Sequence, residues 1–261
     1  MLKISNENMY FTDTGEDLPT LLFVHGILLD HSVWRHQVTA FSGRYRVVCV
    51  DLRGFGRSTA QSPDISFEDH AADLAELITQ LGLHNVTLVG WSMGGAISQV
   101  FASLHGAAIS RLVLVDTSPQ LLASVEFACA LRLEAAQQLG ELLAADFAQG
   151  CRAFCQMITP EDPEAATNLA AIASQTNPDV AFAAFGSSGQ RSLLGLLADI
   201  NIPTLVVAGA DDRICPPDAS RHLARAIPGC KAEARFIQGA GHAPFMTFPD
   251  QFNNVLQAFL G

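Results

Sequence analysis

Short runs of almost entirely apolar residues recur along this chain of 261 residues, separated by longer stretches of mixed polarity. Apolar runs of this length are typical of strands buried on both faces of a sheet. They lie at 20–24, 46–50, 86–89, 111–115, 204–208 and 234–238. Between many of them the apolar residues repeat at helical spacing, for example over 67–81. Strands that alternate with helices predict an α/β fold with a mainly parallel, doubly wound sheet.

Two regions depart from this alternation. Residues 1–12 predict an antiparallel hairpin at one edge of the sheet. Residues 117–202 contain helical patterns punctuated by prolines but no convincing strand, which predicts a helical cap inserted between two strands. We therefore expect a core formed by residues 1–118 and 187–261, with the cap formed by 119–186.

An apolar stripe in the expected cap predicts one helix face that packs on the core and also roofs a cleft. Its members are Leu143, Phe147, Cys151, Phe154, Cys155 and Ile158. Cys151 and Cys155 are one helical turn apart, but no further ligands lie nearby, so packing is favoured over a metal site. The chain lacks a secretory context, so we expect free thiols rather than disulfides.

The composition restricts the class of partner. With 49% hydrophobic and 16% charged residues, the chain is expected to be a compact globule. Its net charge of −11 would repel nucleic acids and anionic membrane surfaces, which favours a small neutral molecule as the partner. No signal-peptide pattern or bilayer-spanning apolar run is present, so we predict a cytoplasmic protein.

The candidate nucleophile is Ser92. It lies in Gly90-Trp91-Ser92-Met93-Gly94-Gly95, directly after an apolar run and directly before a helix-compatible stretch. A serine on a sharp turn between strand and helix is held in strained geometry, and the residues two before and two after it must be small. Gly90 and Gly94 satisfy this requirement, so the pattern indicates a reactive serine.

A serine hydroxyl needs a base near neutral pH, and the base needs an acid that fixes its tautomer. In α/β sheets reactive groups gather beyond the carboxyl ends of strands, and this favours His242 in the loop after the last apolar run. Two acids, Asp211 and Asp212, follow the run 204–208, and Asp116 ends the run 111–115. Position alone leaves Asp211 and Asp212 open, whereas a turn role is favoured for Asp116.

Attack on a carbonyl also requires donors for the oxygen that becomes negative. Two backbone amides are candidates: Met93 N–H, at the start of the expected helix, and Ile27 N–H, after His25-Gly26. His25 is expected to brace this loop through hydrogen bonds rather than to react.

Along nearly its whole length the chain resembles the α/β-hydrolase superfamily. The matching residues are His25-Gly26, Trp34, the stretch 51–58, the Ser92 turn, Gly209 with Asp212, and Gly241-His242. The resemblance implies the α/β-hydrolase fold and the order Ser92, Asp212, His242 for the catalytic triad. It also favours Asp212 over Asp211 and places the second oxyanion donor at Ile27. No metal and no organic cofactor are implied.

The subfamily is indicated by further residues. A serine at position 92 argues against haloalkane dehalogenases and epoxide hydrolases, in which an aspartate is expected there. The loop after His25 lacks the extra glycines and proline of many carbon–carbon bond hydrolases. The run from His242 to Phe245 and the long cap are similar to the carboxylesterases that act on pimeloyl-carrier-protein methyl ester. An acidic carrier would need a basic cap, but this cap offers little beyond Arg132 and Arg152, so a free small ester is favoured.

We therefore expect a serine carboxylesterase of class EC 3.1.1, acting on a small ester with an apolar acyl part. The expected pocket residues are Leu28, Trp91, Phe127, Phe147 and Phe154. Alternatives on the same triad are a cofactor-free perhydrolase or haloperoxidase, a lactonase, and a carbon–carbon bond hydrolase. A ligand receptor that keeps the hydrolase fold is an alternative of another class.

Overall fold

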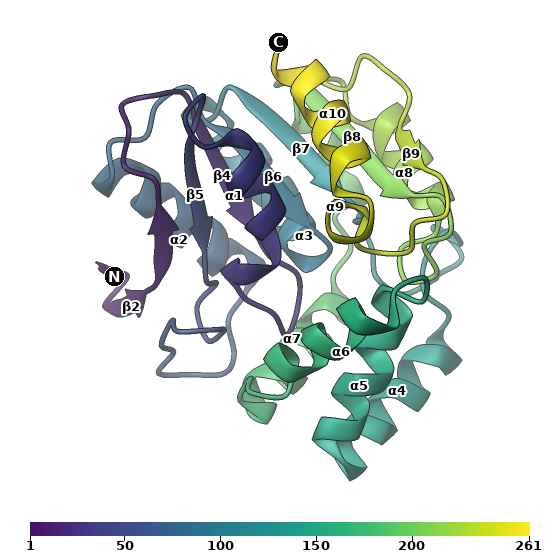
Figure 1. Ribbon diagram of the computed structural model, residues 1–261. Helices are drawn as coiled ribbons and strands as arrows, with labels where there is room; N and C mark the ends of the chain where they lie inside the picture. The colour runs from purple at the N-terminus through teal and green to yellow at the C-terminus, as the bar shows by residue number, and fades with distance from the viewer.

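A computed structural model describes residues 1–261, which form one seven-stranded sheet and one small two-stranded sheet (Figure 1). The strands are β1 (Leu2–Ile4), β2 (Glu7–Met9), β3 (Phe11–Asp13), β4 (Thr20–Val24), β5 (Arg46–Val50), β6 (Thr87–Trp91), β7 (Arg111–Val115), β8 (Thr204–Gly209) and β9 (Arg235–Ile237). The order in the large sheet is β3-β5-β4-β6-β7-β8-β9. Only β3 runs antiparallel to its neighbour; every other pair is parallel.

All six apolar runs form strands of the large sheet, so the predicted parallel α/β sheet is confirmed. The N-terminal prediction is only partly right. β1 and β2 pair with each other around a turn in which Ser5 and Asn6 have positive φ, but they form a separate two-stranded sheet. The edge strand of the large sheet is β3 instead, which follows β2 after one residue and pairs antiparallel with β5.

Helices cover both faces of the sheet, as a parallel sheet requires. α1 (Arg35–Phe41) contacts α10 (Pro249–Leu260) on one face, and α2 (Phe67–Gln80) packs against α3 (Met93–His105) on the other (Figure 1). α2 begins at a capping box in which Ser66 and Asp69 satisfy each other's backbone N–H groups. The remaining elements are η1 (His31–Trp34), η2 (Gly106–Ala108), η3 (Leu194–Asp199), α8 (Pro217–Ala226) and α9 (Pro244–Thr247).

Four helices between β7 and β8 lie together beyond one end of the sheet (Figure 1). They are α4 (Leu133–Ala145), α5 (Phe147–Ile158), α6 (Pro163–Ala173) and α7 (Pro178–Gln190). The predicted apolar stripe is not on one helix. Leu143 belongs to α4, and the chain breaks at Asp146, whose carboxylate accepts the Gln149 N–H at 2.9 Å and caps α5. α7 continues past residue 186, the predicted end of the cap, and the division into core and cap stays a prediction.

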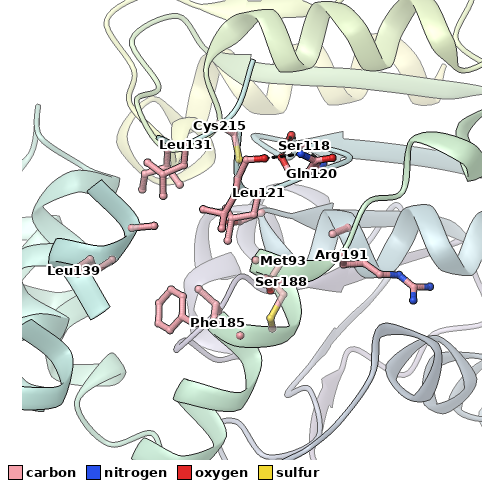
Figure 2. Close-up of a pocket in the computed structure, with 18 of the residues that line it drawn as sticks. Met93, Ser118, Gln120, Leu121, Leu131, Leu139, Phe185, Ser188, Arg191 and Cys215 are labelled. Atoms are coloured by element: carbon pink, nitrogen blue, oxygen red, sulfur yellow. Dashed lines mark hydrogen bonds between the residues drawn. The ribbon is translucent and has the colours of Figure 1, made fainter. Parts of the chain in front are cut away.

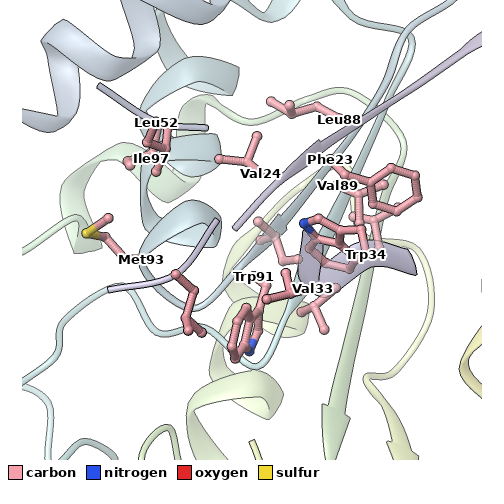
Figure 3. Close-up of a cluster of buried hydrophobic side chains, with 14 of the residues drawn as sticks. Phe23, Val24, Val33, Trp34, Leu52, Leu88, Val89, Trp91, Met93 and Ile97 are labelled. Carbon is pink, nitrogen blue, oxygen red and sulfur yellow. The ribbon is translucent and has the colours of Figure 1, made fainter. Parts of the chain in front are cut away.

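The main core lies between the sheet and its helices. Trp34 lies beside Phe23, with ring centroids 4.8 Å apart (Figure 3). Trp34 also stacks on Phe245, with ring centroids 4.1 Å apart. Cys151 and Cys155 are buried free thiols whose pKa values burial raises to about 11 and about 12, so both side chains act as apolar packing groups. None of the helices combines the length and apolar character needed to cross a bilayer.

Candidate active site

Ser92 occupies a strained turn between β6 and α3. Its backbone has φ 54° and ψ −118°, a conformation that L-residues rarely adopt. The two flanking glycines are required by close backbone contacts. A Cβ on Gly90 would overlap the Gly94 carbonyl, and a Cβ on Gly94 would overlap the carbonyl oxygens of Val24 and His25. The turn therefore lifts the serine above the carboxyl edge of the sheet, with the N-terminus of α3 beside it.

Ser92 is linked to a histidine and an acid through a continuous set of hydrogen bonds. Ser92 Oγ lies 2.9 Å from His242 Nε2, and His242 Nδ1 lies 2.7 Å from Asp212 Oδ2. The three residues follow β6, β8 and β9, so the parallel sheet brings together groups far apart in sequence. His242 and Asp212 are buried, whereas Ser92 is partly exposed. This is the arrangement in which an imidazole can take a proton from a serine hydroxyl.

The structure distinguishes the three candidate acids. Asp212 Oδ1 accepts the backbone N–H groups of Ile214 at 2.8 Å and Cys215 at 3.0 Å, which leaves Oδ2 for the histidine. Asp211 is exposed, and its side chain makes no hydrogen bond. Asp116 is buried behind Asp212 and accepts the Gly209 N–H at 2.7 Å. Burial, and then the nearby Asp212 carboxylate, raise the pKa of Asp116 well above its ordinary value. Asp116 therefore favours the neutral form, and Asp212 is the carboxyl group in contact with His242.

The loop that carries His242 is held by the end of α5 and the loop after it, as well as by the core. The His242 N–H donates to the Ile158 carbonyl at 2.8 Å, and the Gly241 N–H donates to Glu161 Oε1 at 2.9 Å. On the other side, Trp91 Nε1–H donates to the His242 carbonyl at 2.6 Å. These contacts fix the imidazole from both sides, and neither Glu161 nor Ile158 carries a sequence signal that reveals the role.

The loop after β4 places an amide next to the serine. Ile27 N–H donates to no atom of the chain, and Met93 N–H begins α3, where it has no partner within the helix. Ile27 and Met93 both line the cavity at Ser92. His25 braces the loop as expected: its Nδ1 lies 2.7 Å from the Gly26 carbonyl, and Nε2 accepts the Leu52 N–H at 2.9 Å. Burial lowers the pKa of His25, so this histidine remains neutral.

Ser92 lines a cavity of about 320 Å³ that is also bordered by α4, α5 and α7 (Figure 2). Its lining is mostly aliphatic and aromatic, and it comes from the segment 117–122, α4, α5, α7 and the loop after β8. Leucines predominate, namely Leu121, Leu122, Leu131, Leu133, Leu139, Leu143 and Leu193. Arg191 is the one charged residue of the lining, and it pairs with Glu68. In Figure 2 the Arg191 guanidinium points away from the labelled leucines, so no charged group faces this mostly apolar cavity.

Of the five expected pocket residues, only Phe154 lines this cavity. Leu28 is fully buried in the core, and Trp91 packs on Phe245 with ring centroids 4.9 Å apart. Phe127 belongs to a small separate cluster with Ala130 and Ala219. Phe147 lies next to Phe182, with centroids 6.3 Å apart, and it is Phe182 that lines the cavity. The other four predicted pocket residues are therefore wrong, because packing between segments distant in sequence directs their side chains elsewhere.

Two groups of side chains have the composition of a metal site. One is Asp212, Cys215 and His242, but the hydrogen bonds described above use Asp212 and both nitrogens of His242. The other is Asp30, His31 and Asp51. There Asp51 accepts N–H groups of His31 and Arg57, and the carboxylate raises the pKa of the His31 imidazole. This second group therefore ties the loops after β4 and β5 together.

Comparison with known proteins places this geometry in context. The sequence profile of the alpha/beta hydrolase fold family matches residues 19–249. A pimeloyl-[acyl-carrier protein] methyl ester esterase from Vibrio atlanticus is 29% identical over 97% of this chain and 98% of its own length. A bromoperoxidase structure from Bacillus anthracis is 27% identical, with a TM-score of 0.89 and coverage of 97% and 95%. A thermophilic esterase from Thermogutta terrifontis is 30% identical, with a TM-score of 0.82 and coverage of 97% and 92%.

Proposed function

The chain belongs to the alpha/beta hydrolase fold family, and on that premise we propose that it is a serine carboxylester hydrolase acting on a small ester with an apolar acyl part. The single observation that carries the proposal is the hydrogen-bonded set Ser92, His242 and Asp212, in which Ser92 lines a mostly apolar cavity. Relatives named as esterases support the same reaction class. A cytoplasmic location remains part of the proposal.

In the proposed reaction, Ser92 Oγ attacks the ester carbonyl while His242 Nε2 takes its proton. Asp212 holds the proton of His242 Nδ1 and stabilises the imidazolium that forms. The developing oxyanion accepts hydrogen bonds from the free amides of Ile27 and Met93. His242 then protonates the departing alcohol, and the acyl group stays on Ser92 as an ester. Water, activated by the same imidazole, releases the acid and restores the serine.

The first alternative uses the same groups with hydrogen peroxide in place of water. It is favoured by the similarity to a bromoperoxidase, because peroxide attack on the acyl-enzyme would release a peracid. Lactone opening and carbon–carbon bond cleavage would also proceed through Ser92. A carrier-linked substrate is a further alternative, raised by the name of the Vibrio atlanticus relative. Arg132 and Arg152 are exposed but isolated cations on an acidic chain, so a free ester is favoured.

The proposal is tested by measuring turnover of p-nitrophenyl esters, with lactones and peroxide plus carboxylic acid assayed in parallel. We expect multiple turnovers on the esters and a loss of at least about 10³-fold in Ser92→Ala. Ser110→Ala, at an exposed serine outside the site, is the matched control and should keep full activity. Faster turnover with peroxide or a lactone would replace the esterase assignment. Ligand-dependent stabilisation without turnover would favour the receptor alternative.

A further inference from the structure

The helices on either side of the cavity have an unusual feature on the faces that line it. In α4 the lining residues include Leu133, Ala136, Gly140 and Leu143, and in α7 they include Phe182, Phe185, Gly186 and Gly189. These spacings of three and four residues define one face of each helix. Near the centre of each face, where a large apolar residue would normally pack, the sequence has a glycine.

Neither central glycine is explained by packing or by backbone conformation. A Cβ on Gly140 or Gly186 would meet no atom within 4 Å, and neither residue has positive φ. In this respect they differ from Gly150 in α5, where a Cβ would run into Leu143 of α4. Glycine in the interior of a helix is less stable than alanine. Gly140 and Gly186 therefore weaken their helices without allowing any close contact within the chain.

Their shared property is the empty space in front of them. α4 packs mainly against α5 rather than α7, and the cavity lies between the lining faces of α4 and α7. Figure 2 shows Leu139 of α4 and Phe185 of α7 bordering this space, and Met93, which follows the reactive serine in sequence, also lines it. Both glycines line this cavity, and Gly186 is also exposed to solvent, so a side chain at either position would meet open space rather than protein. The missing side chains thus leave room for a chain that starts at Ser92 and runs between the two helices.

We propose that Gly140 and Gly186 determine specificity by keeping this channel open for an unbranched apolar chain on the substrate ester. This inference rests on the proposed esterase function and adds the substrate class, namely esters with a medium-length aliphatic chain rather than acetate-sized esters. The aliphatic lining recognises the chain by burial alone, because no charged group points into the channel. Each glycine acts through the volume that it leaves free.

The test compares Gly140→Leu and Gly186→Leu with wild type on p-nitrophenyl acetate, butyrate and octanoate. The matched control is Gly195→Leu in η3, an exposed glycine that also has no atom within 4 Å of its added Cβ but does not line the cavity. We expect kcat/KM for octanoate to fall at least about tenfold in both cavity variants, with acetate changed by less than about threefold. Their Tm should rise by about 2–4 °C, because leucine is the better helix former.

An equal loss on acetate and octanoate, or no loss on either, would overturn the proposal while leaving the esterase function intact. Methyl octanoate and octyl acetate then identify whether the chain lies on the acyl or the alcohol side. If wild type hydrolyses no ester, the proposed function fails, and the channel is tested by thermal stabilisation with sodium octanoate. Stabilisation of wild type and Gly195→Leu but not of the cavity variants would support the channel. Equal stabilisation of all four proteins would refute it.

Discussion

Replacing Asp212 by asparagine tests how the acid controls the histidine. The Ile214 and Cys215 N–H groups both donate to Asp212 Oδ1, at 2.8 and 3.0 Å. In Asp212→Asn the amide oxygen must therefore take this position, since an NH₂ group there would face two donors. The NH₂ group is left at the former Oδ2 position, 2.7 Å from His242 Nδ1.

An NH₂ group at that position can only donate, so His242 Nδ1 must accept and the imidazole proton moves to Nε2. Nε2 then faces Ser92 Oγ at 2.9 Å with a proton already on it and cannot act as the base. We expect kcat to fall by about 10⁴-fold, which corresponds to about 5.5 kcal/mol of activation free energy. Stability should change little, because both backbone hydrogen bonds to the side chain are kept.

The assay is ester turnover under saturating substrate, with Asp211→Asn as the matched control. Asp211 is exposed and its carboxylate has no hydrogen-bond partner, so this variant should stay within about twofold of wild type. Retention of more than a tenth of the activity in Asp212→Asn would refute the tautomer argument. A larger loss in Asp211→Asn than in Asp212→Asn would move the acid by one position.

Substitutions at three further positions test the supporting structure. Gly94→Ala should lower the free energy of unfolding in urea by about 1–3 kcal/mol, because the Cβ would overlap two carbonyl oxygens at the end of β4; an unchanged midpoint would contradict this. Burial lowers the pKa of His70 to about 3, so the unfolded chain gains a proton below about pH 6.5 that the folded chain does not take up. Between pH 7 and pH 4, wild type should therefore lose about 3 kcal/mol more of its free energy of unfolding than His70→Phe does. Urea titrations at both pH values measure this difference, and an equal pH dependence of the two proteins would contradict it. Glu161→Ala leaves the N–H of the buried residue Gly241 without its acceptor. It should lower the free energy of unfolding by about 1–3 kcal/mol and lower kcat more than it changes KM. Glu161→Gln keeps an acceptor oxygen and should restore both the stability and kcat.

The features that local sequence specifies were predictable. Buried parallel strands need continuous apolar runs, and the turn at Ser92 needs glycines at fixed offsets, so both could be read from residue order. The position of His242 followed from the rule that reactive groups gather at the carboxyl edge of a parallel sheet. The choice of Asp212 came from resemblance and stays a prediction, which the two N–H groups that orient its carboxylate toward His242 support.

Features that depend on packing between distant segments were not predictable. Trp91 ends an apolar strand beside the serine, yet its ring packs against Phe245 and its N–H holds the histidine loop. Phe147 and Phe182 are both aromatic residues of amphipathic helices, and only the relative placement of α5 and α7 decides which of them reaches the cavity. The break at Asp146 was missed because its capping role interrupts an otherwise continuous apolar pattern.

The activation of one serine by one imidazole is tested most directly by reaction with a fluorophosphonate probe, followed by intact-mass spectrometry and peptide mapping. The geometry predicts a single adduct on Ser92, absent in Ser92→Ala and formed at least about 10²-fold more slowly in His242→Gln. An adduct on another residue, or equal labelling rates in wild type and the folded His242→Gln protein, would contradict the account.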